Sequence, residues 1–313
     1  MPITSLASLT VVAVGALWGI YWVPLRQLEA VSAAGPWATL AAVLLGGLCL
    51  APFGWAGRSR LATANNRALA SVALGGASFV LYSNGLLYGR VAVVILLFYL
   101  TPVWSTLIAR FWLGWPVSWW RYAAIVCGLA GIALVLRGSH GGLPLPHTLG
   151  DFLGLASGLL WAIASTGIHV HVRTRPAETN FVFLAGAIVM AAVLALVLGA
   201  ADPPRIPVGQ LGEALFWTLG IGGLWWGLSL VGFLWATREM EPARVGILLM
   251  GEVIVGAVSA ALFAGEPFGL PMGLGSALVV AAGFLETLPD RKAGRAAYEV
   301  PPAGLTRGRR PRR

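Results

Sequence analysis

The chain has 313 residues, of which 58% are hydrophobic and only 11% are charged, and its mean hydropathy is +0.81. A soluble domain of this size keeps a charged shell of roughly 25% of its residues. The composition therefore excludes an ordinary water-soluble fold and indicates a surface that faces lipid. The 14 Trp and the net charge of +9 fit this interpretation, because Trp and basic residues gather at membrane interfaces.

Long apolar segments follow one another along the whole chain. A helix needs about 20 apolar residues to cross a bilayer core of about 30 Å. Reading the apolar runs between charged or Pro/Gly-rich breaks predicts an all-α polytopic membrane protein with ten spans. In chain order these are residues 5–25, 34–55, 68–88, 91–112, 119–137, 151–171, 180–200, 213–235, 243–264 and 269–289.

The basic residues give these spans a direction. With the N-terminus inside, only Arg26, Arg90, Arg137 and Arg205 fall outside, and the rest of the 21 Lys and Arg fall inside. The positive-inside rule thus predicts that both termini are cytoplasmic, in a multi-pass protein of the inner membrane. For the basic tail, residues 290–313, we expect disorder and contact with anionic lipid rather than with nucleic acid.

The two halves of the chain show weak similarity to each other. Ala16 to Trp22 matches Leu159 to Ser165, and Leu100 to Pro116 matches Gly251 to Pro267. A glycine pattern in the third predicted span recurs in the eighth. Because each half holds an odd number of spans, the second would be inverted relative to the first. We predict two inverted five-helix repeats, residues 1–138 and 139–289.

This layout resembles the EamA-type families of the drug/metabolite transporter superfamily. The resemblance is carried by Leu17-Trp18-Gly19 in the first span and by Gly265-Glu266 after the ninth. The first half keeps Pro102 and Gly114 but has Trp115 where the family pattern places an acid, and Val253 follows Glu252 where Glu-Pro is common. The resemblance implies ten helices in two inverted repeats and the transport of small metabolites such as amino acids, most often by export.

Glu252 is the sharpest single feature, because ten apolar or small residues surround it in the segment from Gly246 to Gly256. Eight residues at about 1.5 Å each separate it from Arg244, which places it roughly 12 Å into the membrane. A carboxylate there must face a cavity, a partner or a proton. Glu252 is therefore a candidate for substrate binding and for proton coupling, and the alternative is a hydrogen-bonded fastener between helices.

Aromatic and polar residues deep in the spans suggest a wet central pocket lined by rings. In the first span, Trp18, Tyr21, Trp22 and Leu25 recur at helical spacing and form one predicted face. Such a pocket suits amino acids, aromatic metabolites or organic cations. The predicted substrate-binding residues are Trp18, Tyr21, Trp22, Tyr82, Asn84, Tyr99, Trp104, Trp161, Trp225, Ser229 and Glu252.

The sequence thus favours a secondary transporter that moves small amphipathic metabolites by alternating access, as a monomer or homodimer. An uncoupled facilitator of the same fold is the nearer alternative. A membrane-embedded enzyme acting on lipid-linked substrates is the more distant one, because the short loops lack clustered acids, His and Arg. No metal or nucleotide motif is present, so we expect no cofactor and no metal. The partners expected are a small-molecule substrate and the lipid bilayer.

Overall fold

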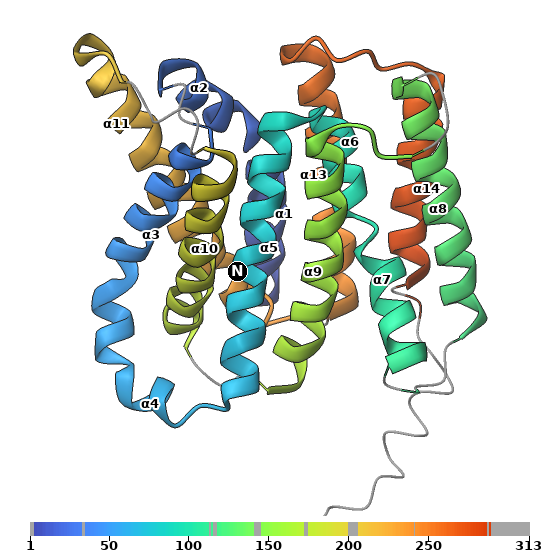
Figure 1. Ribbon diagram of the computed structural model, residues 1–313. Coiled ribbons are helices and arrows are strands. Elements are labelled where there is room, and N and C mark those ends of the chain that lie inside the picture. The colour runs from blue at the N-terminus through green and yellow to red at the C-terminus, as the bar shows by residue number, and fades with distance from the viewer. Residues whose placement is uncertain are drawn as a thin grey trace, which may run out of the picture.

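The computed structural model describes residues 3–32, 35–112, 114, 118–140, 145–171, 175–199, 206–240, 242–286 and 288, and the predicted tail lies outside these ranges. Within them the protein is helical. Helices run side by side between two ends of the bundle, with the short α4 at one end and α2 at the other (Figure 1). The elements of the first half are α1 Ile3–Gly19, α2 Trp22–Ser32, α3 Pro36–Ala56, α4 Arg58–Ala62, α5 Asn66–Tyr88, α6 Val91–Phe98, α7 Thr101–Leu107, the π-helix η1 Ile108–Trp112 and α8 Trp119–His140.

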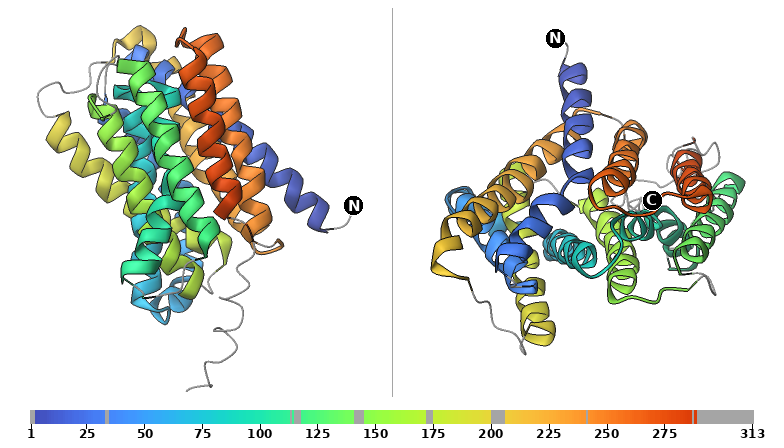
Figure 2. Two further views of the ribbon diagram at one scale, coloured as in Figure 1. Left: turned by 90° about the vertical axis from the view of Figure 1, so that its right-hand side faces the viewer. Right: turned by 90° about the horizontal axis from the view of Figure 1, so that it is seen from above.

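The second half adds eight further elements. They are α9 Leu149–His171, α10 Pro176–Leu198, the 3-10 turn η2 Val208–Gln210, α11 Leu211–Leu219, the π-helix η3 Gly220–Ser229, α12 Leu230–Ala236, α13 Pro242–Phe263 and α14 Leu270–Glu286. Figure 2 shows the same bundle from the side and from above, where the N-terminal part of α1 projects outward from the other helices.

Nine helices within the described residues are long and apolar enough to cross a membrane, by length and composition. They correspond to the first nine predicted spans. The predicted tenth span corresponds to α14, whose apolar stretch Leu270–Leu285 is shorter. The structure therefore confirms an all-helical polytopic membrane protein, while the count of ten and the repeat stay predictions.

Two spans of the first half are interrupted midway. The first breaks between α1 and α2 at Ile20 and Tyr21, and the fourth breaks between α6 and α7 at Tyr99 and Leu100. Pro102 occupies the first turn of α7, where its missing N–H costs no helical hydrogen bond. At the position matched to Pro102 the second half has Val253, and α13 runs through it without a break.

Small residues let the halves approach each other along α1 and α13. A Cβ added at Gly19 would lie 2.8 Å from the Val255 Cβ and 2.9 Å from the Glu252 carbonyl oxygen. Such distances leave no room for a side chain, so the last residue of the Leu-Trp-Gly motif brings the two backbones together beside Glu252.

Two glycines expected to be equivalent turn the chain in the same way. Gly114 and Gly265 both have positive φ, 66° and 63°, in the connections that follow η1 and α13. Glycine adopts this left-handed conformation at little cost, unlike residues with a Cβ. Trp115, the neighbour that departs from the family pattern, lies outside the described residues.

Candidate functional site

Glu252 lies in the middle of α13 with only 3% of its surface exposed. Two tyrosines hold its carboxyl group. The Tyr99 hydroxyl donates to Oε2 at 2.7 Å, and the Tyr82 hydroxyl donates to Oε1 at 3.2 Å. Tyr99 also lies within 3.1 Å of the Leu249 carbonyl oxygen, one turn earlier in α13. The carboxyl is thus fixed by α5 and by the break between α6 and α7.

Within the part of the chain that the structure describes, no basic side chain pairs with this carboxyl group. The ion pairs among the described residues join Arg26 to Glu266 and Arg60 to Glu178, and neither involves Glu252. A buried carboxylate without a counter-ion is costly in a membrane interior. It becomes stable there when it takes up a proton or meets a positively charged ligand, so the site is suited to either event.

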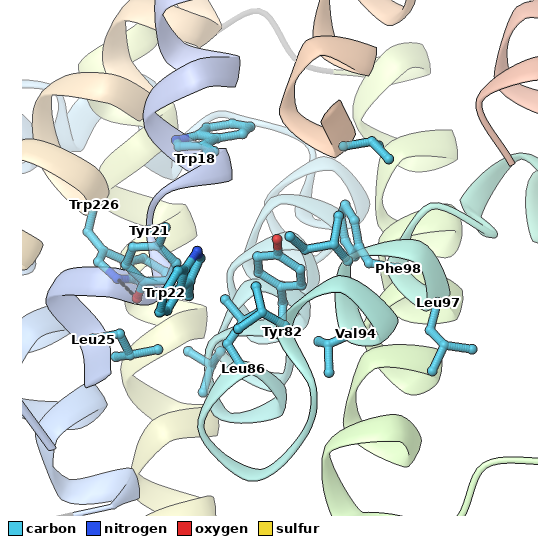
Figure 3. Close-up of a cluster of buried hydrophobic side chains, with 14 of the residues drawn as sticks. Trp18, Tyr21, Trp22, Leu25, Tyr82, Leu86, Val94, Leu97, Phe98 and Trp226 are labelled. Carbon is cyan, nitrogen blue, oxygen red and sulfur yellow. Dashed lines mark hydrogen bonds between the residues drawn. The ribbon is translucent and has the colours of Figure 1, made fainter. Parts of the chain in front are cut away.

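A small cavity opens beside the carboxyl group. It is lined by Trp18, Tyr21, Phe79, Tyr82, Trp225, Trp226, Leu230 and Glu252. The empty space among these side chains is about 310 Å³, but the rings divide it so that it admits little more than water. Figure 3 shows the Tyr82 ring facing the side chains around the break in the first span, with Trp18 above it and Tyr21 and Trp22 to its left. The pocket is therefore closed down in this structure, and a metabolite would need the rings to part.

The break between α1 and α2 aims three predicted residues at different neighbours. Trp18 donates its indole N–H to the Ser229 hydroxyl at 2.9 Å, and Trp22 donates to Ser259 at 3.0 Å. The Tyr21 hydroxyl lies 3.1 Å from the Ser83 hydroxyl. Because the helix is interrupted, these side chains do not form the single continuous face predicted from their spacing; they clamp the first span to η3, α13 and α5.

The π-helix η3 supplies the opposite wall. Trp226 donates to the Tyr21 hydroxyl at 3.0 Å, and Trp225 donates to the Leu17 carbonyl at 2.9 Å. π-helical turns widen a helix and occur often at functional sites. Here the wider turn brings two neighbouring tryptophans and Ser229 to the same break in the first span. Periodicity alone would separate Trp225 and Trp226 around the helix.

Phe79 is a central member of the cluster that sequence reasoning missed. Its ring centre lies 5.3 Å from that of Trp18, 5.3 Å from that of Trp161 and 5.4 Å from that of Phe183. The ring contacts are largely edge-on, the geometry that aromatic pairs favour. A signal was available, because Phe79 precedes Tyr82 by three residues and shares its face of α5.

Three predicted residues lie away from the cavity. Asn84 is fully buried and donates to the Val80 carbonyl of its own helix at 2.9 Å. Trp104 packs on the core in α7, and its indole N–H has no hydrogen-bond partner among the described residues. Trp161 does not line the cavity but packs edge-on against the Phe79 ring, which does. The structure therefore brings together Trp18, Tyr21, Tyr82, Tyr99, Trp225, Ser229 and Glu252, with Trp22 next to them.

Glu266, the acid of the Gly265-Glu266 pair in the sequence pattern, lies at the end of the bundle where α6 begins. Its carboxylate accepts hydrogen bonds from the backbone N–H groups of Val91 at 2.6 Å and Ala92 at 3.2 Å. The Arg26 guanidinium lies 3.9 Å from the same carboxylate. A carboxylate on the first free amides of a helix is a stabilising cap. The connection after α13 therefore holds the start of α6 and joins the two halves.

The features assembled so far define a class of protein. Membrane-spanning helices, two of them broken beside a buried carboxyl group and a ring-lined cavity, are the construction of small-molecule membrane transporters. Residues 5–137 match the model of the EamA-like transporter family. The first half of the chain is therefore similar to this family, which lies within the drug/metabolite transporter superfamily.

Comparison with other proteins supports the fold and adds no substrate. No curated protein matches the chain. Fifteen solved chains are similar to it. One of them, described as "Crystal structure of protein", aligns over 90% of this chain and 95% of its own length, with a TM-score of 0.55 and 18% identity. At this identity the likeness concerns the fold, and it extends beyond the first half into the second.

Proposed function

We propose that this transporter moves small amphipathic metabolites, amino acids foremost, across the inner membrane by alternating access, in the direction of export. The observation that supports this most directly is the carboxyl group of Glu252, which has no counter-ion among the described residues and lies beside a cavity lined by aromatic rings. A ligand with an ammonium group would neutralise the carboxylate and rest its cation against Trp18 or Trp225. Its apolar part would occupy the space that the rings now close.

The proposed coupling follows from the same geometry. When no cationic ligand is present, a proton on Glu252 removes the cost of a buried charge. Exchange of a proton for a ligand at one carboxyl group would couple their movements in opposite directions. The uncoupled facilitator differs from this scheme in one respect, because there Glu252 keeps the same protonation state throughout and acts as a link between α13, Tyr82 and Tyr99.

Uptake into proteoliposomes tests the proposal. Purified protein is supplied with a pool of labelled amino acids, with and without a pH gradient, as wild type and as Glu252→Gln. Glu213→Gln is the matched control, because Glu213 is an exposed carboxylate in the first turn of α11. We expect gradient-driven accumulation by the wild type and the control, and its loss in Glu252→Gln while downhill exchange survives.

The other outcomes separate the alternatives. Equal equilibration in all three proteins, with no response to the gradient, would leave a facilitator and reduce Glu252 to a structural link. Absence of uptake for every amino acid would contradict the proposed substrate class. Chemical conversion of an added lipid-linked compound would favour the membrane-embedded enzyme.

A further inference from the structure

A second hollow lies beside α4, a short helix at one end of the bundle. Figure 1 shows the position of α4 at that end. The hollow runs between α3, α4 and α10 and contains about 1000 Å³ of open space. Its lining is apolar except for one cation and comprises Leu48, Ala51, Pro52, Gly54, Trp55, Arg58, Leu61 and Phe181. We propose that this groove binds an anionic phospholipid, with the phosphate on Arg58 and an acyl chain along α3.

Glycines at the end of α3 shape the groove. A Cβ at Gly54 would lie 2.6 Å from Cγ of Phe181, and a Cβ at Gly57 would lie 2.6 Å from Cδ of Glu178. Both contacts are too close for any side chain. The two glycines therefore let the start of α10 come up against α3, and the Phe181 ring becomes the floor of a groove whose wall includes Leu48 and Trp55.

Neighbouring arginines on α4 have different surroundings. Arg60 forms an ion pair with Glu178, whose carboxylate is only 3% exposed and also accepts from the Arg175 backbone N–H at 3.3 Å. The hydrogen bonds that Arg60 donates to the Glu178 carboxylate raise the pKa of Arg60 above its ordinary value. Arg58 has no acidic partner among the described residues. It is held in place over the groove by Trp55, whose ring centre lies 4.9 Å from the guanidinium carbon and whose carbonyl accepts at 3.1 Å.

The ligand follows from this arrangement. A guanidinium presents five N–H donors, and Arg58 uses one of them in the contact just described, so donors remain for phosphate oxygens. The exposed Trp55 ring, 72% accessible, suits the headgroup level of a bilayer, and the apolar wall below it suits an acyl chain. One uncompensated positive charge selects lipids with net negative charge over zwitterionic ones. Lipid binding in this groove is independent of the transported substrate and of proton binding at Glu252.

Lipid-dependent stability tests it on the full chain in neutral detergent. The thermal unfolding midpoint is measured with added phosphatidylglycerol, with phosphatidylcholine and with water-soluble glycerol phosphate. The variants are Arg58→Gln and Arg121→Gln, the latter in the first turn of α8 on the other side of the bundle (Figure 1). We expect phosphatidylglycerol to raise the midpoint of the wild type and of Arg121→Gln by several degrees more than phosphatidylcholine does. Arg58→Gln should lose at least half of that difference.

A second variant keeps the charge and fills the groove. In Ala51→Phe the new ring would occupy the place of the acyl chain, and we expect the phosphatidylglycerol effect to fall although Arg58 remains. An equal effect of phosphatidylglycerol on wild type and Arg58→Gln would overturn the proposal. So would an equal effect of glycerol phosphate and the lipid, because the groove would then bind a free anion and not a lipid.

Discussion

The carboxyl group of Glu252 accepts two hydrogen bonds of unequal length. Tyr99 is the shorter donor at 2.7 Å and Tyr82 the longer at 3.2 Å. Removing a donor from a buried carboxylate costs about 1–3 kcal/mol. We therefore expect Tyr99→Phe to lower the free energy of unfolding by more than Tyr82→Phe. Chemical denaturation in detergent measures the difference, and equal losses would contradict the ranking.

The contact of Gly19 with α13 gives a prediction of steric origin. In Gly19→Ala the added methyl group would meet Val255 and the Glu252 carbonyl at under 3 Å. Overpacking of this kind costs typically 1–3 kcal/mol. Gly251→Ala is the matched control, because nothing lies within 4 Å of a Cβ there. The thermal midpoint should fall in the first variant and stay or rise slightly in the second; two equal shifts would argue against close packing of α1 on α13.

Single residues also show how much of the candidate site can be predicted from the sequence. Glu252 is identifiable from the sequence because a carboxyl group in an apolar run must be explained, and its chemistry depends little on the exact orientation of its helix. The polarity and depth of Asn84 and Trp104 predict that they line the pocket, yet in the structure they contact other neighbours. Depth can be counted along a sequence. The direction in which a side chain points depends on how each helix is rotated against its neighbours, and packing decides that.

At the scale of elements, α13 is continuous at the position where the matched fourth span is broken between α6 and α7. A proline substitution in α13 tests the reason for this difference. The carbonyl of Leu249 lies four residues before Val253, so a proline at 253 would deprive that carbonyl of its helical donor. The Tyr99 hydroxyl already lies 3.1 Å from the same oxygen. Because the steric clash of the proline ring remains, only the hydrogen-bond part of the usual ~3 kcal/mol is relieved, and we expect Val253→Pro to cost about 1 kcal/mol less than a proline elsewhere in the helix.

A double-mutant cycle checks this explanation. Val253→Pro should cost more in a Tyr99→Phe background, because the carbonyl would then lose its helical donor and also the Tyr99 hydroxyl proton that it shares with Glu252. Val258→Pro, an exposed position of the same helix, is the control and should show the full cost in either background. Additive effects of Val253→Pro and Tyr99→Phe would mean that Tyr99 does not replace the helical bond.

Elements were predictable where hydrophobicity decides them. The nine long spans follow apolar runs, and the break before α7 follows from the steric demands of Pro102. The break at Ile20 and Tyr21 has a similar signal in Pro24, which lies in the first turn of α2 and has no N–H to donate to the Ile20 carbonyl. Long-range hydrogen bonds from Trp18, Tyr21 and Trp22 to three other elements accompany this break. The π-helical stretch η3, in contrast, has no signal in the sequence pattern and is set by tertiary contacts.

The whole molecule carries a prediction about its direction in the membrane. The distribution of basic residues predicts that α4 is cytoplasmic and that the connection after α13 is outside. In a background without Cys49 and Cys127, we expect Phe268→Cys to react with a membrane-impermeant maleimide on intact cells. Ser59→Cys should react only after the cells are opened. The reverse pattern would invert the topology, and labelling of both in intact cells would contradict the paired assignment.

The breaks in the first and fourth spans both border the candidate site, through Tyr21 and Tyr99, whereas α13 passes Glu252 without interruption. At each break three-residue turns replace part of the regular helical hydrogen-bond ladder, so less of that ladder has to be bent when the two half-helices tilt. A continuous helix has no such joint. The carboxyl group of Glu252 is therefore carried by a continuous helix and faces two helix breaks. The first half of the molecule, which contains both breaks, would close around a ligand while Glu252 keeps a nearly constant depth in the membrane.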